Sequence, residues 1–259
     1  MKHLLSSGLV AGLAAGLLCA LLQYLLVEPQ ILLAERYESG EITHFQGVAG
    51  SAASSDDHAP MAMRDDAGQG DAGQGSDASA AESAPTHGAA AEVTSPAGRQ
   101  ALTVLFAVLT YAGFGLVLAG GMMAAESRGR RICKPEAILW GLAGFMAFQM
   151  MPALGLAPEL PGTPAADLNA RQIWWAATAI ATIVGLGLLA YGRNMTHRLV
   201  GVASAAVPHL VGAPELDSFG GIVPPELAAT FAARSLGVGL ITWAVLGLAV
   251  EGLWHSRRA

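Results

Sequence analysis

Six long apolar runs alternate with polar stretches along this chain of 259 residues. The runs are Leu4–Val27, Ala101–Ala125, Ala137–Leu156, Ile173–Tyr191, Leu199–Val211 and Leu227–Trp254. A helix of about 20 residues, rising about 1.5 Å per residue, crosses the hydrocarbon core of a bilayer. The fifth run is shorter than this and contains Pro208 in its last turn. The pattern predicts an all-α, polytopic membrane bundle of six spans, with the fifth span short or partly irregular.

The first run could be mistaken for a cleaved signal peptide. It is longer than the apolar core of such a peptide, which has about 7–15 residues, and no A-x-A cleavage site follows it. We therefore expect a retained helix. Gly8, Gly12 and Gly16 recur every fourth residue on one face of this helix. Such a repeat predicts close approach of another helix.

Three regions follow from the change in composition along the chain. Residues 1–38 hold the first membrane helix and an outer amphipathic extension, which begins after Glu28-Pro29. Residues 39–100 are rich in Ala, Gly, Ser and Asp and include the repeat GQGDAGQGSDAS, which predicts a disordered acidic periplasmic linker. Residues 101–259 are expected to form a five-helix bundle with short loops.

The charges predict the orientation of the spans. Only 13% of the residues are charged and 53% are hydrophobic, with a mean hydropathy of +0.46. Cytoplasmic loops of membrane proteins are enriched in Lys and Arg. If all six runs span, one side collects three of the 20 acids and most of the 14 basic residues, namely Lys2, Arg128, Arg130, Arg131, Lys134, Arg193, Arg198, Arg257 and Arg258. This distribution predicts two cytoplasmic termini and an acidic outer face, which attracts cations.

Composition and motifs exclude several classes of function. A net charge of −6 argues against a nucleic-acid partner, because phosphate binding needs clustered Lys and Arg. The chain lacks the G-x-x-x-x-G-K-[ST], G-x-S-x-G, H-E-x-x-H and C-x-x-C motifs, so we expect neither an ATPase nor an ordinary hydrolase, and no cofactor. Two cysteines, Cys19 and Cys133, are interpreted as structural thiols.

The outer links repeat a pairing of proline with glutamate. It occurs at Glu28-Pro29, in APEL at 157–160, in APEL again at 213–216, and in Pro-Pro-Glu at 224–226. One interpretation is that these steps only mark helix ends, where proline and a first-turn acid are favourable. The other is that the carboxylates converge on a divalent cation, for which oxygen ligands are suitable.

His209 favours the second interpretation, because imidazole is a common metal ligand and an ionisable group at membrane depth suggests function. A histidine at the interface, bonded to backbone, is the alternative. In the linker, Asp56, Asp57, His58, Met61 and Met63, with His44 and His87, could collect metal loosely, although their spacing matches no closed site. Met150 and Met151, beside Gln149, are interpreted as core residues.

Four motifs in order resemble the CbtA family. They are LVEPQILLAERYE, PELPGTPAADLNARQIWW, PHLVGAPE and VPPELAATFAARSL, and the resemblance covers residues 1–40 and 101–258. The family consists of predicted cobalt transporter subunits associated with cobalamin biosynthesis and typically encoded beside a small single-span partner, CbtB. It is often described with five spans and a His/Glu-rich first outer loop, whereas this chain carries a Gly/Asp/Ser-rich linker with three histidines.

The resemblance implies which residues act. It points to Glu28, Glu35, Glu38, Glu159, Asp167, His209 and Glu215 as metal ligands, and to Arg171, Trp174, Trp175 and Arg234 as structural or gating residues. Arg171 is expected to pair with a carboxylate, and the two tryptophans are expected to be interface anchors. The resulting expectation is a multi-pass subunit of a cobalt(II) uptake transporter in a bacterial inner membrane, in contact with lipid and a CbtB-like partner.

Other functions stay open at this point. A nickel or other divalent-metal permease would use the same ligands, since nitrogen and oxygen donors do not single out cobalt. A non-transporting scaffold would dock its partner on the Gly8, Gly12 and Gly16 face. A membrane enzyme acting on lipid is the weakest alternative, because no paired nucleophile and base is evident.

Overall fold

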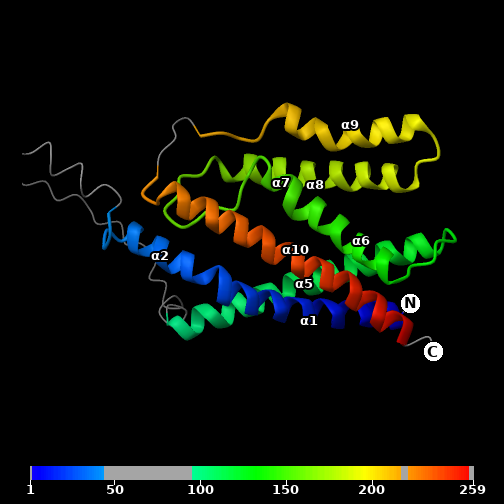
Figure 1. Cartoon of the computed structure of the whole chain (residues 1–259), viewed down its shortest axis with the longest axis horizontal. Coiled ribbons are helices and arrows are strands. Elements are labelled where there is room, and N and C mark those ends of the chain that lie inside the picture. The colour runs from blue at the N-terminus through cyan, green and yellow to red at the C-terminus, as the bar shows by residue number, and fades with distance from the viewer. Residues whose placement is uncertain (1, 44–94, 217–220, 257–259) are drawn as a thin grey trace, which may run out of the picture. The chain divides into compact units, whose positions relative to one another are not determined.

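The computed structural model describes residues 2–43, 95–216 and 221–256, and all secondary structure within them is helical (Figure 1). Within these ranges, residues 2–43, 100–216 and 221–256 form one compact unit. The helices are α1 (Lys2–Leu26), α2 (Glu28–Glu38), α5 (Pro96–Glu126), α6 (Lys134–Phe145), the π-helical turn η1 (Met146–Met150), α7 (Met151–Ala153), α8 (Leu168–Tyr191), α9 (Met195–Val211) and α10 (Pro225–Ser256). The expectation of an all-α protein is confirmed.

Four helices are long and apolar enough to cross a membrane: α1, α5, α8 and α10. The two remaining predicted spans take other forms. The third is divided among α6, η1 and α7, which together cover residues 134–153. The fifth is α9, which keeps Pro208 inside its last turn as the sequence indicated. By length and apolarity alone, the described helices thus support four membrane spans and not the six that were predicted.

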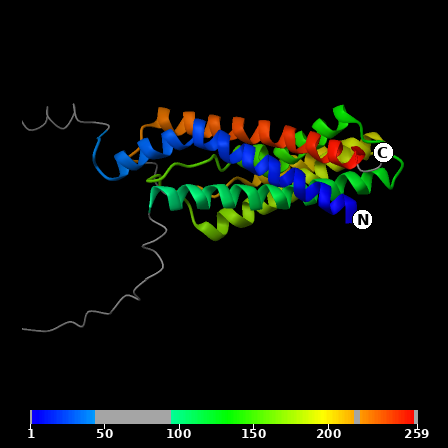
Figure 2. The same ribbon diagram turned by 90° about the horizontal axis from the view of Figure 1, so that it is seen from below.

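Close packing joins α1 to α5 (Figure 2). A Cβ atom added at Gly8 would lie 2.8 Å from the Gly115 carbonyl oxygen, and one at Gly16 would lie 2.5 Å from the Val108 Cα. Gly12 meets the backbone of Tyr111 just as closely. The glycine face is therefore covered by α5. The scaffold alternative, which needed this face free for a partner, is wrong about its docking surface.

Helix α10 packs between α1 and α6 and supplies much of the core. Small residues again permit the approach, because a Cβ atom at Gly247 would meet the Ala137 backbone. Trp243, Leu246 and Val250 are almost completely buried on this helix. The Ser7 hydroxyl of α1 donates a hydrogen bond to the Leu253 carbonyl oxygen of α10 at 3.3 Å. This end of α10 is the one predicted to face the cytoplasm. These contacts bring the first and last helices of the chain together.

Helix α2 continues α1 after a break at Val27. Pro29 lies in the first turn of α2, where its missing N–H costs nothing. The amphipathic extension expected after Glu28-Pro29 corresponds to this helix, which buries Gln30 and Ala34. The guanidinium of Arg234 on α10 donates a hydrogen bond to the Leu26 carbonyl oxygen at 3.1 Å. Its positive charge therefore lies at the C-terminal end of α1, where the helix dipole favours it.

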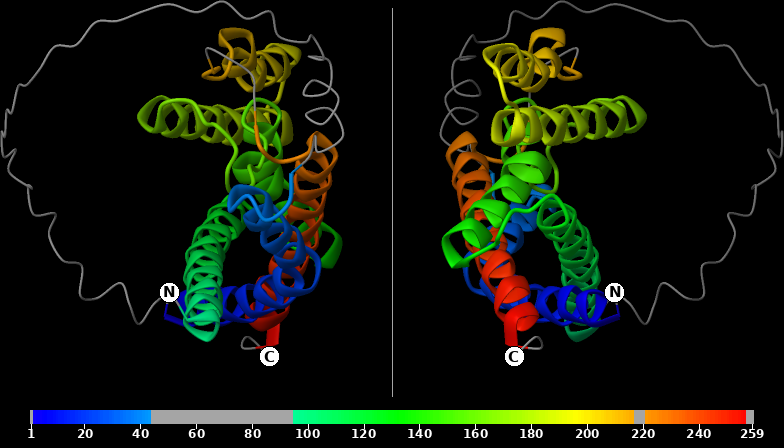
Figure 3. Two further views of the ribbon diagram at one scale, coloured as in Figure 1. Left: turned by 90° about the vertical axis from the view of Figure 1, so that its left-hand side faces the viewer. Right: turned by 90° about the vertical axis from the view of Figure 1, so that its right-hand side faces the viewer.

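Helices α8 and α9 form an antiparallel hairpin (Figure 1), which lies at the top of both views in Figure 3, away from α1. Gly185 and Gly201 allow the two backbones to approach, and the Ser204 hydroxyl donates to the Ala181 carbonyl at 3.0 Å. At the other end, Trp174 Nε1 donates to the Pro208 carbonyl oxygen at 3.1 Å. This hairpin positions the link of residues 154–167, which precedes α8.

Several predictions concern residues outside the described part of the chain. They include the linker residues His44, Asp56, Asp57, His58, Met61, Met63 and His87. The proposed three-region organisation, with a disordered linker at 39–100, also stays a prediction.

Candidate functional site

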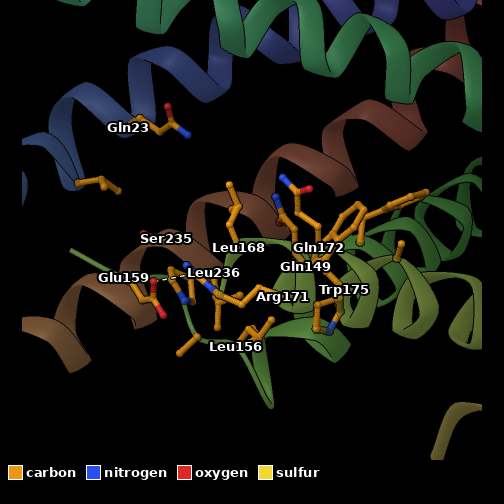
Figure 4. A pocket seen from close by; sticks show the side chains of 17 residues that line it. Gln23, Gln149, Leu156, Glu159, Leu168, Arg171, Gln172, Trp175, Ser235 and Leu236 are labelled. Carbon is orange, nitrogen blue, oxygen red and sulfur yellow. Dashed lines mark hydrogen bonds and ion pairs between the residues drawn. The ribbon is translucent and has the colours of Figure 1, made fainter. Parts of the chain in front are cut away.

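A cavity of about 770 Å³ lies between α1, η1 with α7, the following link, α8 and α10 (Figure 4). Its wall is mostly apolar. The polar side chains in the lining are Gln23, Gln149, Glu159, Arg171, Gln172 and Ser235. They come from five separate segments, so the cavity exists only in the folded bundle.

Glu159 and Arg171 form an ion pair at the cavity wall. Arg171 lies in the first turn of α8, and its Nη2 donates to Glu159 Oε2 at 2.6 Å. The side chains are 25% and 32% exposed, respectively, so solvent screens the pair only partly. Arg171 Nε is buried without a hydrogen-bond partner among the described residues. Glu159 is thus the carboxylate partner that the sequence led us to expect for Arg171.

Local sequence explains how the link presents this pair. Asp167 caps α8, because its Oδ1 accepts a hydrogen bond from the Ala170 N–H at 2.9 Å. Leu160 is buried in the core and anchors the link on the other side of Glu159. Gly162 has a φ of +77°, a conformation that suits glycine, and it turns the link beside Glu38 of α2.

Three amide side chains face the cavity from different helices (Figure 4). Gln23 comes from α1, Gln149 from η1 and Gln172 from α8. The Gln149 Oε1 atom is buried and accepts no hydrogen bond from described residues. It fits against α10 only because position 239 is glycine, since a Cβ atom there would collide with this oxygen. A π-helical turn such as η1 is frequent at functional sites.

Aromatic rings pack next to the cavity. Phe148 and Trp175 line it, with ring centroids 6.2 Å apart. Phe148 stacks on Trp243 at 5.7 Å, and Phe114 contacts both rings at 5.0 and 4.7 Å. Trp243 is only 1% exposed. This aromatic cluster (Phe114, Phe148, Trp175 and Trp243) connects the cavity wall with the core.

The second APEL link lies beside the first. Trp174 is buried, and its ring lies 5.8 Å from the His209 imidazole in an edge-on arrangement. A Cβ atom at Gly155 would meet both the Trp174 ring and the Ala213 methyl group. Trp174 therefore joins α8, α9 and the two links, and its place at the membrane interface stays a prediction. Trp175 is 40% exposed and borders the cavity.

The predicted metal ligands occupy separate positions. Glu28 accepts a hydrogen bond from Gln100 Nε2 at 3.2 Å, and Glu35 and Glu38 lie on α2. Glu215 is exposed, whereas His209 Nε2 is buried without a partner among the described residues. Within the described ranges, no group of three or more His, Cys, Asp or Glu side chains is placed to hold one metal ion. Of the seven, Glu159 alone lines the cavity.

Sequence reasoning missed the amides Gln23, Gln149 and Gln172 and the hydroxyl of Ser235. A detectable signal existed for two of them, because Gln23 and Gln149 interrupt otherwise apolar runs. Polar side chains within membrane helices usually face other helices or a cavity. That the three amides share one cavity could not be read from their spacing.

The arrangement offers oxygen donors around an open volume. A divalent ion with its octahedral water shell needs roughly 200 Å³, at about 30 Å³ per water, so the cavity can admit a hydrated ion. Amide and carboxylate oxygens suit hard and borderline divalent cations. The cavity lining contains no paired nucleophile and base of the kind that hydrolases use.

Comparison with known proteins identifies the family. No curated protein and no solved structure matches the chain. Residues 1–255, nearly its full length, match the family described as "Probable cobalt transporter subunit (CbtA)". The several membrane-length helices agree with this match, and the chain belongs to the CbtA family of probable cobalt transporter subunits.

Proposed function

We propose that this subunit admits cobalt(II) to the cytoplasm through the cavity between α1, η1, α8 and α10. The observation that carries the proposal is the meeting of a carboxylate and three amides in a space large enough for a hydrated ion. Glu159 exchanges for water of the incoming ion, and the oxygens of Gln23, Gln149 and Gln172 complete the contacts. Arg171 competes with the ion for Glu159 and holds the link in place while the cavity is empty.

The proposed topology puts this cavity on the outer side of a bacterial inner membrane. Six segments span, with the α6–η1–α7 segment and α9 completing the four long helices, and both termini are cytoplasmic. The charge asymmetry of the loops supports this orientation. The shorter α9 is tolerated because its partner α8 covers one side of it.

The remaining predicted ligands serve an outer rim in this proposal. Their positions support collection of cations rather than one closed site, because no three of them converge. The rim consists of Glu28, Glu35, Glu38, Asp167, His209 and Glu215. Acidic surfaces of this kind raise the local concentration of cations. Since the family is named as a subunit, we infer a partner, which the family resemblance suggests is a small CbtB-like single-span protein.

Inward movement needs no nucleotide hydrolysis by this chain. The membrane potential contributes about 2.3 kcal/mol per charge for each 100 mV, and about twice that for a divalent ion. The chain has no nucleotide-binding loop motif, which agrees with a passive or partner-driven route.

Cobalt accumulation in cells tests the proposal directly. Cells lacking other cobalt uptake express the full chain with its partner, and the metal content is determined over time. We expect Glu159→Gln to raise the half-saturating cobalt concentration by about tenfold or more, as loss of a metal contact usually does. Glu226→Gln is the matched control, because Glu226 is an exposed acid at the start of α10 outside the cavity lining. Equal uptake by both variants would remove Glu159 from the route.

Nickel is the second candidate cargo, because oxygen donors do not distinguish it from cobalt. Uptake of cobalt in the presence of excess nickel separates the two. Strong competition that disappears in Glu159→Gln indicates a shared route through the cavity, whereas absence of competition assigns the route to cobalt.

A further inference from the structure

A buried cluster of polar side chains adjoins the cavity at Gln149. It consists of Cys19 from α1, Tyr111 from α5, Gln149 from η1 and Thr242 from α10. The hydroxyl of Tyr111 has the thiol of Cys19, the amide of Gln149 and the hydroxyl of Thr242 as neighbours. Four helices thus direct one polar group each to a single place among apolar residues.

The cluster is almost sealed from solvent. Cys19 is 2% exposed, Tyr111 4% and Thr242 0%. A cluster this deeply buried in a membrane helix bundle is costly unless its polar atoms find partners. The Thr242 hydroxyl donates to the Val238 carbonyl at 2.8 Å, which leaves its oxygen lone pairs available.

Two atoms of the cluster lack the partners that burial demands. The Tyr111 hydroxyl and the Gln149 Oε1 atom are both buried, and neither reaches hydrogen-bond geometry with another atom of the described part of the chain, although Cys19, Gln149 and Thr242 lie next to the hydroxyl. Buried polar groups are paired in the great majority of folded proteins, so each exception needs an explanation. A bound cation explains both, because it accepts lone pairs from the two oxygens at once.

The cluster connects to the cavity through two residues. Gln149 belongs to both, and Gln23, in the cavity lining, lies one helical turn from Cys19 on the same face of α1. Cys19 is seven residues from the end of α1 at Leu26, which is about 10 Å along the helix. An ion leaving the cavity would meet this cluster next.

We propose that Cys19, Tyr111, Gln149 and Thr242 form a second, dehydrated transit site for the divalent cation, adjoining the cavity. The inference rests on the proposed function and names the next station of the same route. One thiolate with three neutral oxygens binds a borderline cation without holding it tightly, as a route through a membrane requires. The Cys19 thiol releases its proton to the solvent of the cavity when the metal binds. Cys19 is therefore assigned a role beyond the structural thiol expected from sequence.

A cobalt–thiolate absorption band tests the site independently of transport. The full chain is purified in detergent as Cys133→Ser, which leaves Cys19 as the one remaining thiol, and titrated with cobalt(II) chloride. Serine keeps the N-cap position of α6. We expect a near-ultraviolet charge-transfer band that disappears in Cys19→Ser/Cys133→Ser. Tyr111→Phe and Gln149→Leu should each weaken binding by about tenfold.

Thr178→Val is the matched control for burial. Thr178 is 0% exposed and its hydroxyl also has no hydrogen-bond partner among the described residues, but it lies on α8 and is not a neighbour of Tyr111. It should leave the band unchanged, and the unfolding temperature of each variant verifies folding. A folded Cys133→Ser protein without the band would overturn the site. A band insensitive to both Tyr111→Phe and Gln149→Leu would also overturn it, because the thiol alone would then bind.

The two proposals fail separately. Uptake that depends on Glu159 without a thiolate band rejects the transit site and leaves the cavity route intact. A band together with uptake that ignores Glu159 rejects the cavity route while the buried site stands.

Discussion

The guanidinium of Arg171 lies 2.6 Å from the carboxylate of Glu159, at the wall of a cavity that three glutamines also line. A cation that enters this cavity competes with a fixed positive charge for the same carboxylate. In the proposed route the pair therefore sets how strongly the empty cavity attracts metal, and Glu159 and Arg171 have opposite effects.

Arg171→Gln tests this opposition. Removal of the positive charge should lower the half-saturating cobalt concentration for uptake, whereas Glu159→Gln should raise it. Opposite charges about 4 Å apart interact by a few kcal/mol near a protein surface, and partial exposure reduces this, so a shift of about threefold to tenfold is expected. If both variants raised the half-saturating concentration, the pair would act only by holding the link.

Gly239→Ala should displace Gln149 without unfolding the bundle. The added methyl group collides with the end of the Gln149 side chain, which can rotate away. Cobalt uptake should fall while the unfolding temperature changes little. Gly237→Ala serves as the control, because nothing lies within 4 Å of an added Cβ atom there. Equal uptake by the two variants would argue against a role for the position of Gln149.

Gly12→Leu should disrupt the contact between α1 and α5. A side chain at this position collides with the backbone of Tyr111 and Ala112, which cannot move aside. Overpacking of this kind costs about 1–3 kcal/mol or more. Expression and thermal unfolding in detergent measure the loss. Gly113→Leu on α5, where nothing lies within 4 Å, should be tolerated, and similar losses in both would contradict the packing.

Trp174→Phe removes the hydrogen bond from Nε1 to the Pro208 carbonyl. A buried hydrogen bond contributes about 1 kcal/mol net, and the smaller ring leaves a gap against Gly155. The unfolding temperature should drop more than in Trp175→Phe, since Trp175 borders the cavity and is 40% exposed. The reverse order would show that the α8–α9 hairpin does not depend on this bond.

The six-span topology predicts which thiols an impermeant maleimide reaches in intact cells. Cys133, exposed between α5 and α6, should react only after the inner membrane is permeabilised. A cysteine introduced as Glu226→Cys in the Cys133→Ser background should react from outside. Labelling of Cys133 in intact cells would reverse the assignment of the two faces.

The sequence by itself determined the membrane class, the all-helical fold and the family, because these follow from patterns local to each segment. Apolar runs define helices through their length, and the Gly8, Gly12 and Gly16 repeat reports a close helix contact through its period. Arg171 was likewise expected to find a carboxylate, which proved to be Glu159. The π-helical turn that divides the third run was not predictable from hydrophobicity. The residues of a π-helical turn and of an α-helical turn can be equally apolar, so the apolar pattern does not distinguish them.

Only the tertiary structure decided which polar groups meet. Gln23 is far in the chain from Gln149 and Glu159, and helix packing brings all three to one cavity. The same packing buried Trp174 between α8, α9 and the two links. It also placed Cys19 of α1 beside Tyr111 of α5, although the two helices are far apart in the chain. A sequence pattern records the face of each helix, whereas a site depends on which faces meet, and that is set by the crossing of helices whose small residues allow contact.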